Sequence, residues 1–353
     1  MASDTKRGYP HEANGGGQLA VKKQRRQDGS ALPVSTRKVE PEGPARTSAL
    51  LAPTMLLTGH AGEVFTAKFS PDGTVVASGS HDKHVFLWRT YGECENYMML
   101  QGHKGAVLEL HWTTDGERIA SASPDKSVRV WDAATGAQVK KMAEHDNFVN
   151  SCCPLKRGPP LLVSGSDDAT AKLWDLRAKR SVATFDERFQ VVAVAFASAG
   201  DQVYVAGVEN VIKVWDLRKA EVAMTMKGHA HTVTGLRVSP DGTHLLSNAM
   251  DNTLRMWDMR PFAPANRCTK VFTGHQHNFE QNLLKCDWSP DGSRVTAGSA
   301  DRMVYIWDAA SRALLYQLPG HSGSVNETTF HPTEPIICSA GSDKQIYLGE
   351  LVL

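Results

Sequence analysis

Tryptophan returns along this chain at an interval of about 42 residues. Six tryptophans carry the interval, and five of them are followed by Asp: Trp88, Trp131, Trp174, Trp215, Trp257 and Trp307. In a second series His follows Gly, and four of these pairs precede one of the tryptophans while the fifth follows the last, at Gly59, Gly102, Gly228, Gly274 and Gly320. A dipeptide that returns at this period is typical of a repeat architecture, in which each unit buries its apolar face against the next copy.

The unit between Gly59 and Trp88 consists of short strands. Residues 64–69 alternate in polarity and end at Ser-Pro-Asp-Gly, a strong turn sequence. Two further short strands, near residues 75–78 and 85–88, precede a fourth that leads to the next Gly-His pair. Four strands separated by turns in each repeat predict a four-stranded propeller blade rather than a βαβ unit. We therefore expect an all-β fold.

The repeats number seven. The six tryptophans account for six blades, and a seventh follows Gly320, with Gly349 where its Trp would stand. The chain ends directly after the third strand of that blade, so we expect residues 54–58 to supply its fourth strand. Such closure would protect sheet edges that would otherwise pair with other chains. The predicted domain is a seven-bladed β-propeller over residues 54–353.

Residues 1–53 differ in composition from the rest of the chain. They are rich in Gly, Pro, Ser, Lys and Arg and have no periodic apolar stretch, so we expect a disordered tail. The tail is basic, with nine Lys or Arg and five Asp or Glu in residues 1–50. Its densest cluster predicts a nuclear-import signal or a contact with RNA or an acidic partner, and a solvated tail without a receptor is the alternative. This cluster comprises Lys22, Lys23, Arg25 and Arg26.

Composition excludes several classes of protein. The formal net charge is +1, so the molecule as a whole is no polycation. No run of 18 apolar residues occurs, so we expect no contact with a membrane. The six cysteines include no CxxC pair and no zinc-type spacing, which favours reduced thiols. We expect neither a metal nor a cofactor.

These repeats resemble the WD-repeat (WD40) family over residues 54–353. The resemblance implies that each blade holds a buried, hydrogen-bonded tetrad of Trp, Ser or Thr, His and Asp. Four blades of this sequence match the pattern in full, with His60, Ser78, Asp82 and Trp88; His103, Ser121, Asp125 and Trp131; His145, Ser164, Asp168 and Trp174; and His229, Ser247, Asp251 and Trp257.

Three blades depart from the tetrad pattern. Blade four has Val205 at the Ser position and Glu209 at the Asp position. Blade six has Ala297 in place of Ser, and blade seven has Gly349 in place of Trp. We expect these blades to depend more on apolar packing and blade four to be the softest part of the ring.

Ser, His and Asp together also suggest a hydrolase. The trio occurs in four blades, however, whereas a nucleophile is needed once, and each trio is accompanied by a Trp. A catalytic serine requires an exposed hydroxyl and an oxyanion hole, and tetrad residues would be buried. The chain also contains neither a GxxxxGK[ST] phosphate loop nor an HExxH motif. We therefore predict that it is not an enzyme and has no small-molecule substrate.

Partner binding is expected on loops, because propeller strands hold variable loops in fixed positions. Phe65, Phe148 and Met250 occupy positions where the family contacts its partners. Two intervals between Gly-His pairs are longer than the rest and carry Phe262 and Phe279. Aromatic side chains dominate interface energies, although any one of these five residues alone could be an ordinary loop residue.

Stretches outside the generic repeat, among them residues 260–264 and 277–284, resemble WD-repeat subunits of the spliceosomal U5 particle. The resemblance implies a non-catalytic scaffold that acts in pre-mRNA splicing in the nucleus. Its partners would be spliceosomal proteins, chiefly the large central scaffold protein of the U5 particle. Association with RNA would be mostly indirect, and a near-neutral propeller is expected to have no basic stripe.

A second hypothesis is a substrate receptor of a cullin-type ubiquitin ligase. Many such receptors carry a WDxR motif, and Arg177, Arg218 and Arg260 each follow a Trp-Asp pair at that spacing. The signal is weak, because an Arg after the third strand of a blade can simply pair with a neighbouring carboxylate.

Overall fold

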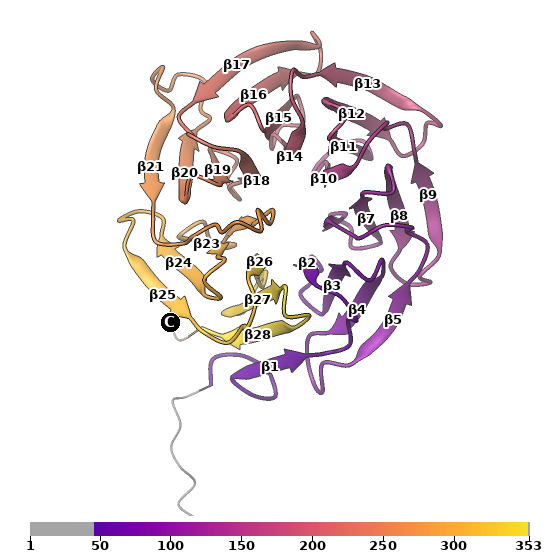
Figure 1. Ribbon diagram of the computed structural model, residues 1–353, viewed down its shortest axis with the longest axis vertical. Helices are drawn as coiled ribbons and strands as arrows, with labels where there is room; N and C mark the ends of the chain where they lie inside the picture. Colours follow the sequence, from indigo (N-terminus) through magenta and orange to yellow (C-terminus); the bar gives the residue numbers. More distant parts are fainter. Residues whose placement is uncertain (1–45, 352–353) are drawn as a thin grey trace, which may run out of the picture. The chain divides into compact units, whose positions relative to one another are not determined.

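The computed structural model describes residues 46–351 of the 353-residue chain. These residues form one compact unit of 28 strands, arranged as seven four-stranded antiparallel sheets around a ring (Figure 1). The expected all-β, seven-bladed propeller is therefore confirmed. Within this part of the chain, no helix is long and apolar enough to cross a membrane. The tail residues Lys22, Lys23, Arg25 and Arg26 lie outside the described residues, as does the predicted disorder of residues 1–45.

Blades one to three follow each other along the chain, and each consists of four consecutive strands. Blade one comprises β2 (Val64–Phe69), β3 (Val75–Ser80), β4 (Val85–Arg89) and β5 (Asn96–Leu100). Blade two comprises β6 (Glu109–Trp112), β7 (Arg118–Ser123), β8 (Ser127–Asp132) and β9 (Gln138–Met142). Blade three comprises β10 (Val149–Pro154), β11 (Leu161–Ser166), β12 (Thr170–Asp175) and β13 (Ser181–Asp186).

Blades four to six have the same organisation. Blade four comprises β14 (Val191–Phe196), β15 (Gln202–Gly207), β16 (Val211–Asp216) and β17 (Glu221–Lys227). Blade five comprises β18 (Val233–Val238), β19 (His244–Ala249), β20 (Thr253–Asp258) and β21 (Cys268–Phe272). Blade six comprises β22 (Cys286–Trp288), β23 (Arg294–Gly298), β24 (Val304–Asp308) and β25 (Leu314–Leu318).

Blade seven joins the two ends of the ring. Its inner three strands are β26 (Val325–Phe330), β27 (Ile336–Gly341) and β28 (Ile346–Glu350), and its outer strand is β1 (Thr54–Leu57). β1 pairs antiparallel with β28, with Thr54 opposite Gly349 and Leu57 opposite Ile346. Figure 1 shows β1 running along the outside of β28. A strand from the beginning of the ring thus covers the edge that the last strand would otherwise expose.

The segment before β1 is ordered against blade seven, which corrects the predicted boundary of the tail at residue 53. The Arg46 guanidinium lies 2.7 Å from the Glu350 carboxylate. The backbone N–H of Ala49 donates to Glu334 at 2.8 Å, and Leu50 is only 4% exposed. Residues 46–50 therefore belong with the propeller, and the tail proper ends before Arg46. Sequence composition missed this because polar contacts with a carboxylate about 300 residues away leave no local periodicity.

The two faces of the ring are distinguished by strand direction. In every blade the first strand lies innermost and neighbouring strands are antiparallel. Loops before the first strand and turns between the second and third strands therefore lie on one face, here called the upper face. Turns between the first and second strands, and between the third and fourth, lie on the opposite face, here called the lower face. Each loop is assigned to a face on this basis below.

Apolar cores fill the spaces between successive blades. Trp131, for example, is 1% exposed and packs in one cluster with Leu87 of blade one and Leu110 of blade two. Hydrogen bonds supplement this packing near the upper face, where the buried Asn150 amide donates to the Val191 carbonyl of the next blade at 3.0 Å. Each blade is thus held to its neighbours by burial of apolar area, the dominant stabilising effect in such a core.

Charged side chains on the innermost strands meet around the centre of the ring. Ion pairs join Lys68 to Glu327, Lys285 to Glu109 at 3.3 Å, and Arg237 to Asp287 at 2.8 Å. These pairs connect blade one to seven, six to two and five to six. They contribute equal numbers of positive and negative charges, so this central network is electrically balanced. Removing one partner of such a buried pair destabilises the fold strongly, because the other charge is left buried without compensation.

Candidate functional site

The structure brings together each of the four predicted tetrads. In blade one, the Trp88 indole donates to the Ser78 hydroxyl at 2.8 Å, and His60 Nε2 lies 2.7 Å from the same hydroxyl. His60 Nδ1 lies 2.8 Å from the Asp82 carboxylate. The same three contacts, within 0.1 Å, occur in blades two, three and five.

The tetrads hold their aspartates ionised. Burial raises the pKa of Asp82, but hydrogen bonds from His60 and from the backbone N–H groups of His84 and Ala61 outweigh it and lower the pKa to about 2. Burial also lowers the pKa of His103, which favours the neutral imidazole. A neutral ring that donates from Nδ1 to the carboxylate accepts at Nε2 from the serine. Each hydroxyl is therefore used once as donor and once as acceptor.

The tetrad serines are not accessible to a substrate. Ser121 is fully buried, Trp131 is 1% exposed and His103 is 7% exposed. Both hydrogen-bonding roles of the Ser121 hydroxyl are occupied by Trp131 and His103. A fully satisfied buried network of this kind rigidifies the structure around it.

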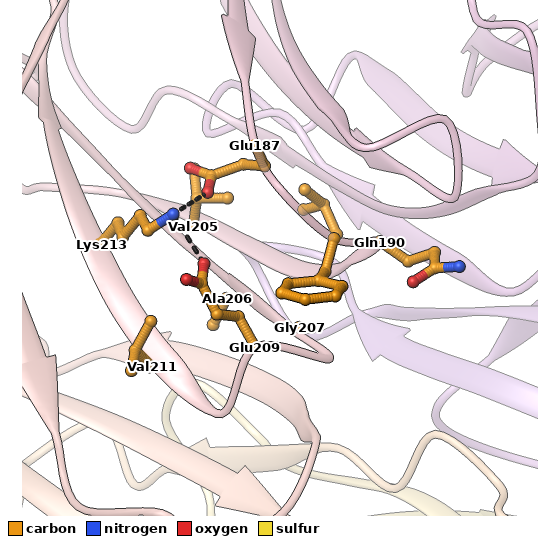
Figure 2. A pocket seen from close by; sticks show the side chains of 10 residues that line it. Glu187, Gln190, Val205, Ala206, Gly207, Glu209, Val211 and Lys213 are labelled. Atoms are coloured by element: carbon orange, nitrogen blue, oxygen red, sulfur yellow. Dashed lines mark hydrogen bonds and ion pairs between the residues drawn. The ribbon is translucent and has the colours of Figure 1, made fainter.

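Blade four replaces the tetrad with an ionic network, beside the expected apolar packing of Val205 in a buried cluster that Trp215 contacts. Glu187 stands at the His position, and its carboxylate accepts from the Trp215 indole at 2.7 Å. The Lys213 ammonium lies 2.6 Å from Glu187 and 2.7 Å from Glu209 (Figure 2). These three side chains line a small pocket, and Val205, at the Ser position, forms part of its wall. Glu187 is thus the acceptor of the indole in place of Ser, and Lys213 pairs with both carboxylates.

Blade six also has a polar network, beside the expected apolar packing of Ala297 in one buried cluster with Trp307. Ala297 contributes no hydroxyl, and the Trp307 indole donates instead to the Thr273 carbonyl at 3.2 Å. The Tyr305 hydroxyl donates to Asp301 at 2.6 Å, in the role that His plays in a complete tetrad. Burial, followed by the hydrogen bond to Asp301, raises the pKa of Tyr305 to about 12.

Blade seven keeps three of its four partners. His321 lies 2.9 Å from the Ser339 hydroxyl and 3.0 Å from the Asp343 carboxylate. Where the indole is missing at Gly349, the Tyr347 ring packs edge-on against His321, with ring centroids 4.7 Å apart. Apolar and aromatic packing does replace a hydrogen bond here, in agreement with the expectation for this blade.

The predicted partner-binding residues lie on both faces. Phe148 and Phe279 precede first strands and Met250 follows a second strand, so all three belong to the upper face. Phe65, at the upper end of β2, is half-buried with its ring edge-on to His81. Phe262 lies between β20 and β21 and is therefore on the lower face.

Exposure separates these residues further. Phe279 is 91% exposed, Phe148 is 49% exposed and Phe262 is fully exposed, whereas Met250 is half-buried. Phe189, which was not predicted, is 41% exposed in the loop before β14, and the Arg188 guanidinium lies 5.3 Å from its ring centroid. Its place in the loop that leads into a first strand, as for Phe148, was the signal that could have identified it. The upper face thus carries three exposed aromatic rings on blades three, four and six.

The sequence profile of the WD domain, G-beta repeat family matches residues 51–89, 94–132, 136–175, 220–258, 266–308 and 312–348. These matches cover most of the propeller and omit residues 176–219, which contain the first three strands of blade four, where the tetrad is replaced. The chain belongs to the WD40-repeat family. The tetrads are therefore part of a framework that this WD40 protein shares with its family. Features particular to this chain are found where its repeats depart from the pattern.

Curated relatives match this WD40 chain over most of its length. The U5 small nuclear ribonucleoprotein 40 kDa protein of Homo sapiens is 54% identical over 88% of this chain and 87% of the relative. The protein of the same name from Dictyostelium discoideum is 50% identical over 88% of this chain and 87% of the relative. Pre-mRNA-splicing factor cwf17 of Schizosaccharomyces pombe is 43% identical over 87% of this chain and 90% of the relative.

The arginines of the WDxR motifs lie on the lower face. Arg177 and Arg260 form ion pairs with Asp175 at 2.7 Å and with Asp258 at 2.5 Å. Each aspartate precedes its arginine by two residues, so these contacts are local. This is the pairing with a neighbouring carboxylate that was the simpler interpretation of the motif. Arg218 is exposed.

Possible metal ligands do not converge within residues 46–351, where no group of three or more His, Cys, Asp or Glu side chains is arranged to hold a metal ion. All six cysteines are free thiols. Burial raises the pKa of Cys286 to about 12, which disfavours the reactive thiolate.

Proposed function

We propose that this chain is a non-catalytic scaffold of a U5-type small nuclear ribonucleoprotein and acts in pre-mRNA splicing in the nucleus. The relatives' names support this proposal, because proteins from three organisms that match nearly the whole chain are named as U5 or splicing components. Its partners are spliceosomal proteins, chiefly the large central scaffold protein of the particle. Most of its association with RNA then passes through those proteins. Lys22, Lys23, Arg25 and Arg26 serve as the import signal in this proposal.

The observation that carries the scaffold role is the pair of exposed rings Phe148 and Phe279 on one face of a stiff ring. Interfaces gain most of their energy from a few aromatic anchors. A single soluble chain does not gain by exposing such rings to water, because burial of a Phe side chain is worth about 1.5–3 kcal/mol. The tetrad serines are buried and each makes two hydrogen bonds, which favours a structural role over catalysis.

Affinity purification of the tagged full-length chain from nuclear extract tests this proposal. We expect splicing proteins and U5 RNA in the eluate. The double variant Phe148→Ala/Phe279→Ala should capture at least about tenfold less splicing protein than the wild type. Phe262→Ala is the matched control, because it removes an equally exposed ring from the lower face.

Two results would contradict the proposal. Recovery of a ubiquitin-ligase adaptor without splicing proteins, abolished by Arg177→Ala/Arg218→Ala, would replace it with the receptor hypothesis. Full capture of splicing proteins by the double variant would refute the assignment of Phe148 and Phe279 as anchors.

A further inference from the structure

The lower face of blades three and four is built from four turns that contact one another. In blade three, the backbone N–H of Leu176 donates to the Pro160 carbonyl at 2.9 Å, which joins turn 175–180 to turn 155–160. In blade four, the same contact joins Leu217 to Asp201 at 3.0 Å, between turns 216–220 and 197–202. The turns of the two blades meet where Gly200 lies against Leu155. These four turns are here called the lower patch.

The lower patch is strongly basic. It contains three aspartates, Asp175, Asp201 and Asp216, against seven exposed cationic side chains: Lys156, Arg157, Arg177, Lys179, Arg180, Arg218 and Lys219. Among these cations, the ion pairs found in residues 46–351 involve Arg177 alone, with Asp175. The expectation that the propeller has no basic stripe is therefore wrong for this face, because a net charge near zero concealed segregated charges.

Blade two, and blade one beyond it, have the opposite charge on this face. The corresponding lower-face turns of blades one and two, with the strand ends beside them, contain two basic residues and six acidic ones: Arg89 and Arg118 against Asp72, Glu93, Glu95, Asp115, Glu117 and Asp132. The positive charge of blades three and four therefore does not continue towards blades two and one. An excess of like charge costs free energy through self-repulsion, so a concentrated sector is most stable with an anionic partner.

Lys156 connects the patch to the central ionic network. A small cavity there is lined by Lys156 together with Arg237, His111 and Cys153. Although the Lys156 side chain is exposed by its accessible area, its position at this cavity partly removes it from water, and this desolvation and the positive charge of Arg237 lower its pKa. A nearby anionic group would stabilise its ammonium form.

The patch lacks the features of a protein interface. The large apolar side chains that are well exposed in residues 46–351 all lie outside its four turns. Protein interfaces rely on apolar or aromatic anchors, and an acidic protein partner would find none here. The turns also contain no aromatic ring on which a base could stack. What remains is a set of mostly unpaired ammonium and guanidinium groups, which suits a partner with regularly repeated negative charge.

We propose that the lower patch binds the phosphate backbone of RNA directly and without reading its sequence. The proposal rests on the proposed function, since a ribonucleoprotein subunit works in contact range of RNA. Lys and Arg contacts to phosphate position a protein on a nucleic acid but carry no sequence information. The upper face then remains available for protein partners, and the lower face adds a direct contact to the mostly indirect association with RNA.

The experiment measures binding of the purified full-length chain to a fluorescent oligouridine by anisotropy, at several salt concentrations. The patch variant is Lys156→Gln/Arg157→Gln/Lys179→Gln/Arg180→Gln. The matched control, Lys83→Gln/Lys104→Gln/Lys126→Gln/Lys344→Gln, removes four exposed lysines from the upper face. Both variants keep the basic tail, so the difference between them isolates the patch. Thermal unfolding confirms that both remain folded.

We expect the patch variant to bind oligouridine at least about tenfold more weakly at low salt, with the control close to wild type. The slope of log affinity against log salt should decrease by about 0.7 for each phosphate that the variant no longer neutralises. Equal weakening in both variants, or none in the patch variant, would overturn the proposal. So would patch-dependent binding of polyglutamate with unchanged RNA affinity, which would identify an acidic protein partner. Because the assay uses purified protein, its outcome is independent of capture of U5 components from extract.

Discussion

Each tetrad serine does two things that no apolar residue could do. The Ser78 hydroxyl accepts from the Trp88 indole and lies 2.7 Å from His60 Nε2, to which it donates. Because the His60 ring is held at Nδ1 by Asp82, the orientation of the indole depends on a carboxylate at the far end of the network. Removing any partner leaves a buried polar group unsatisfied, which costs about 1–3 kcal/mol.

Acid should weaken the tetrads. The pKa of Asp82 is about 2 in the folded chain, against an ordinary value of 3.8. Since the folded-state pKa is the lower one, its stabilisation is complete above the unfolded-state value and is lost as pH falls from 3.8 towards 2. The difference corresponds to about 2 kcal/mol. We expect Asp82→Asn to lower the free energy of unfolding at pH 7 by about that amount and to make its decline below about pH 5 less steep.

Urea unfolding between about pH 7 and about pH 2.5 measures both effects. Asp146→Asn serves as the control, because it removes an exposed aspartate from the upper-face loop that carries His145. An acid dependence of Asp82→Asn equal to that of the wild type would show that the Asp82 carboxylate does not stabilise blade one through its ionised form.

At the scale of the blade, the structure shows more than one solution to the same requirement. A buried Trp needs an acceptor for its indole N–H. Complete blades provide Ser, whereas blade four provides Glu187 and neutralises it with Lys213. Blade six instead uses the backbone carbonyl of Thr273. A polar partner for the indole is thus retained in every blade that has the Trp.

Rebuilding the tetrad in blade four tests this requirement. Val205 lies opposite Lys213 as Ser78 lies opposite Phe86, so the triple variant Glu187→His/Val205→Ser/Glu209→Asp places all four groups in register. We expect it to fold with an unfolding free energy close to that of the wild type. Glu187→Leu, which leaves the indole without an acceptor and Lys213 with one carboxylate, should lose about 1–3 kcal/mol.

Urea unfolding and amide hydrogen exchange in β14–β17 provide the measurements. The single variant should exchange faster in blade four than in blade two, which keeps its own tetrad. If Glu187→Leu were as stable as the wild type, packing alone would hold blade four, and the ionic network would be incidental.

The parts of this architecture that could be predicted are those whose residues recur at a fixed spacing in the sequence. Ser78, Asp82 and Trp88 lie on one hairpin, so their hydrogen bonds repeat as a pattern in the sequence. The network of Glu187 and Lys213 could not be predicted, because each residue alone is an ordinary surface charge. The lower patch was not predicted for a related reason. Its turns are separated by many residues along the chain and lie side by side only in the folded ring.

At the scale of the whole molecule, the ring is closed by two sets of long-range contacts. The outer closure is the pairing of β1 with β28, reinforced by Arg46 and Leu50 against blade seven. The inner closure is the central ionic network, in which Lys68 of blade one pairs with Glu327 of blade seven. The outer closure completes blade seven with a strand that leads directly into blade one, and the inner closure joins the first strands of blades one and seven.

Truncation separates the contributions of the outer closure. A chain that begins at residue 46 keeps both closures intact and should unfold at the wild-type temperature. A chain that begins at residue 54 keeps β1 but loses Leu50, whose burial is worth about 2 kcal/mol, so its midpoint should fall by several degrees. A chain that begins at residue 59 exposes the edge of β28 and should associate through it. Thermal unfolding and light scattering measure both effects; a monomeric 59–353 chain of wild-type stability would show that the inner ionic network closes the ring without β1.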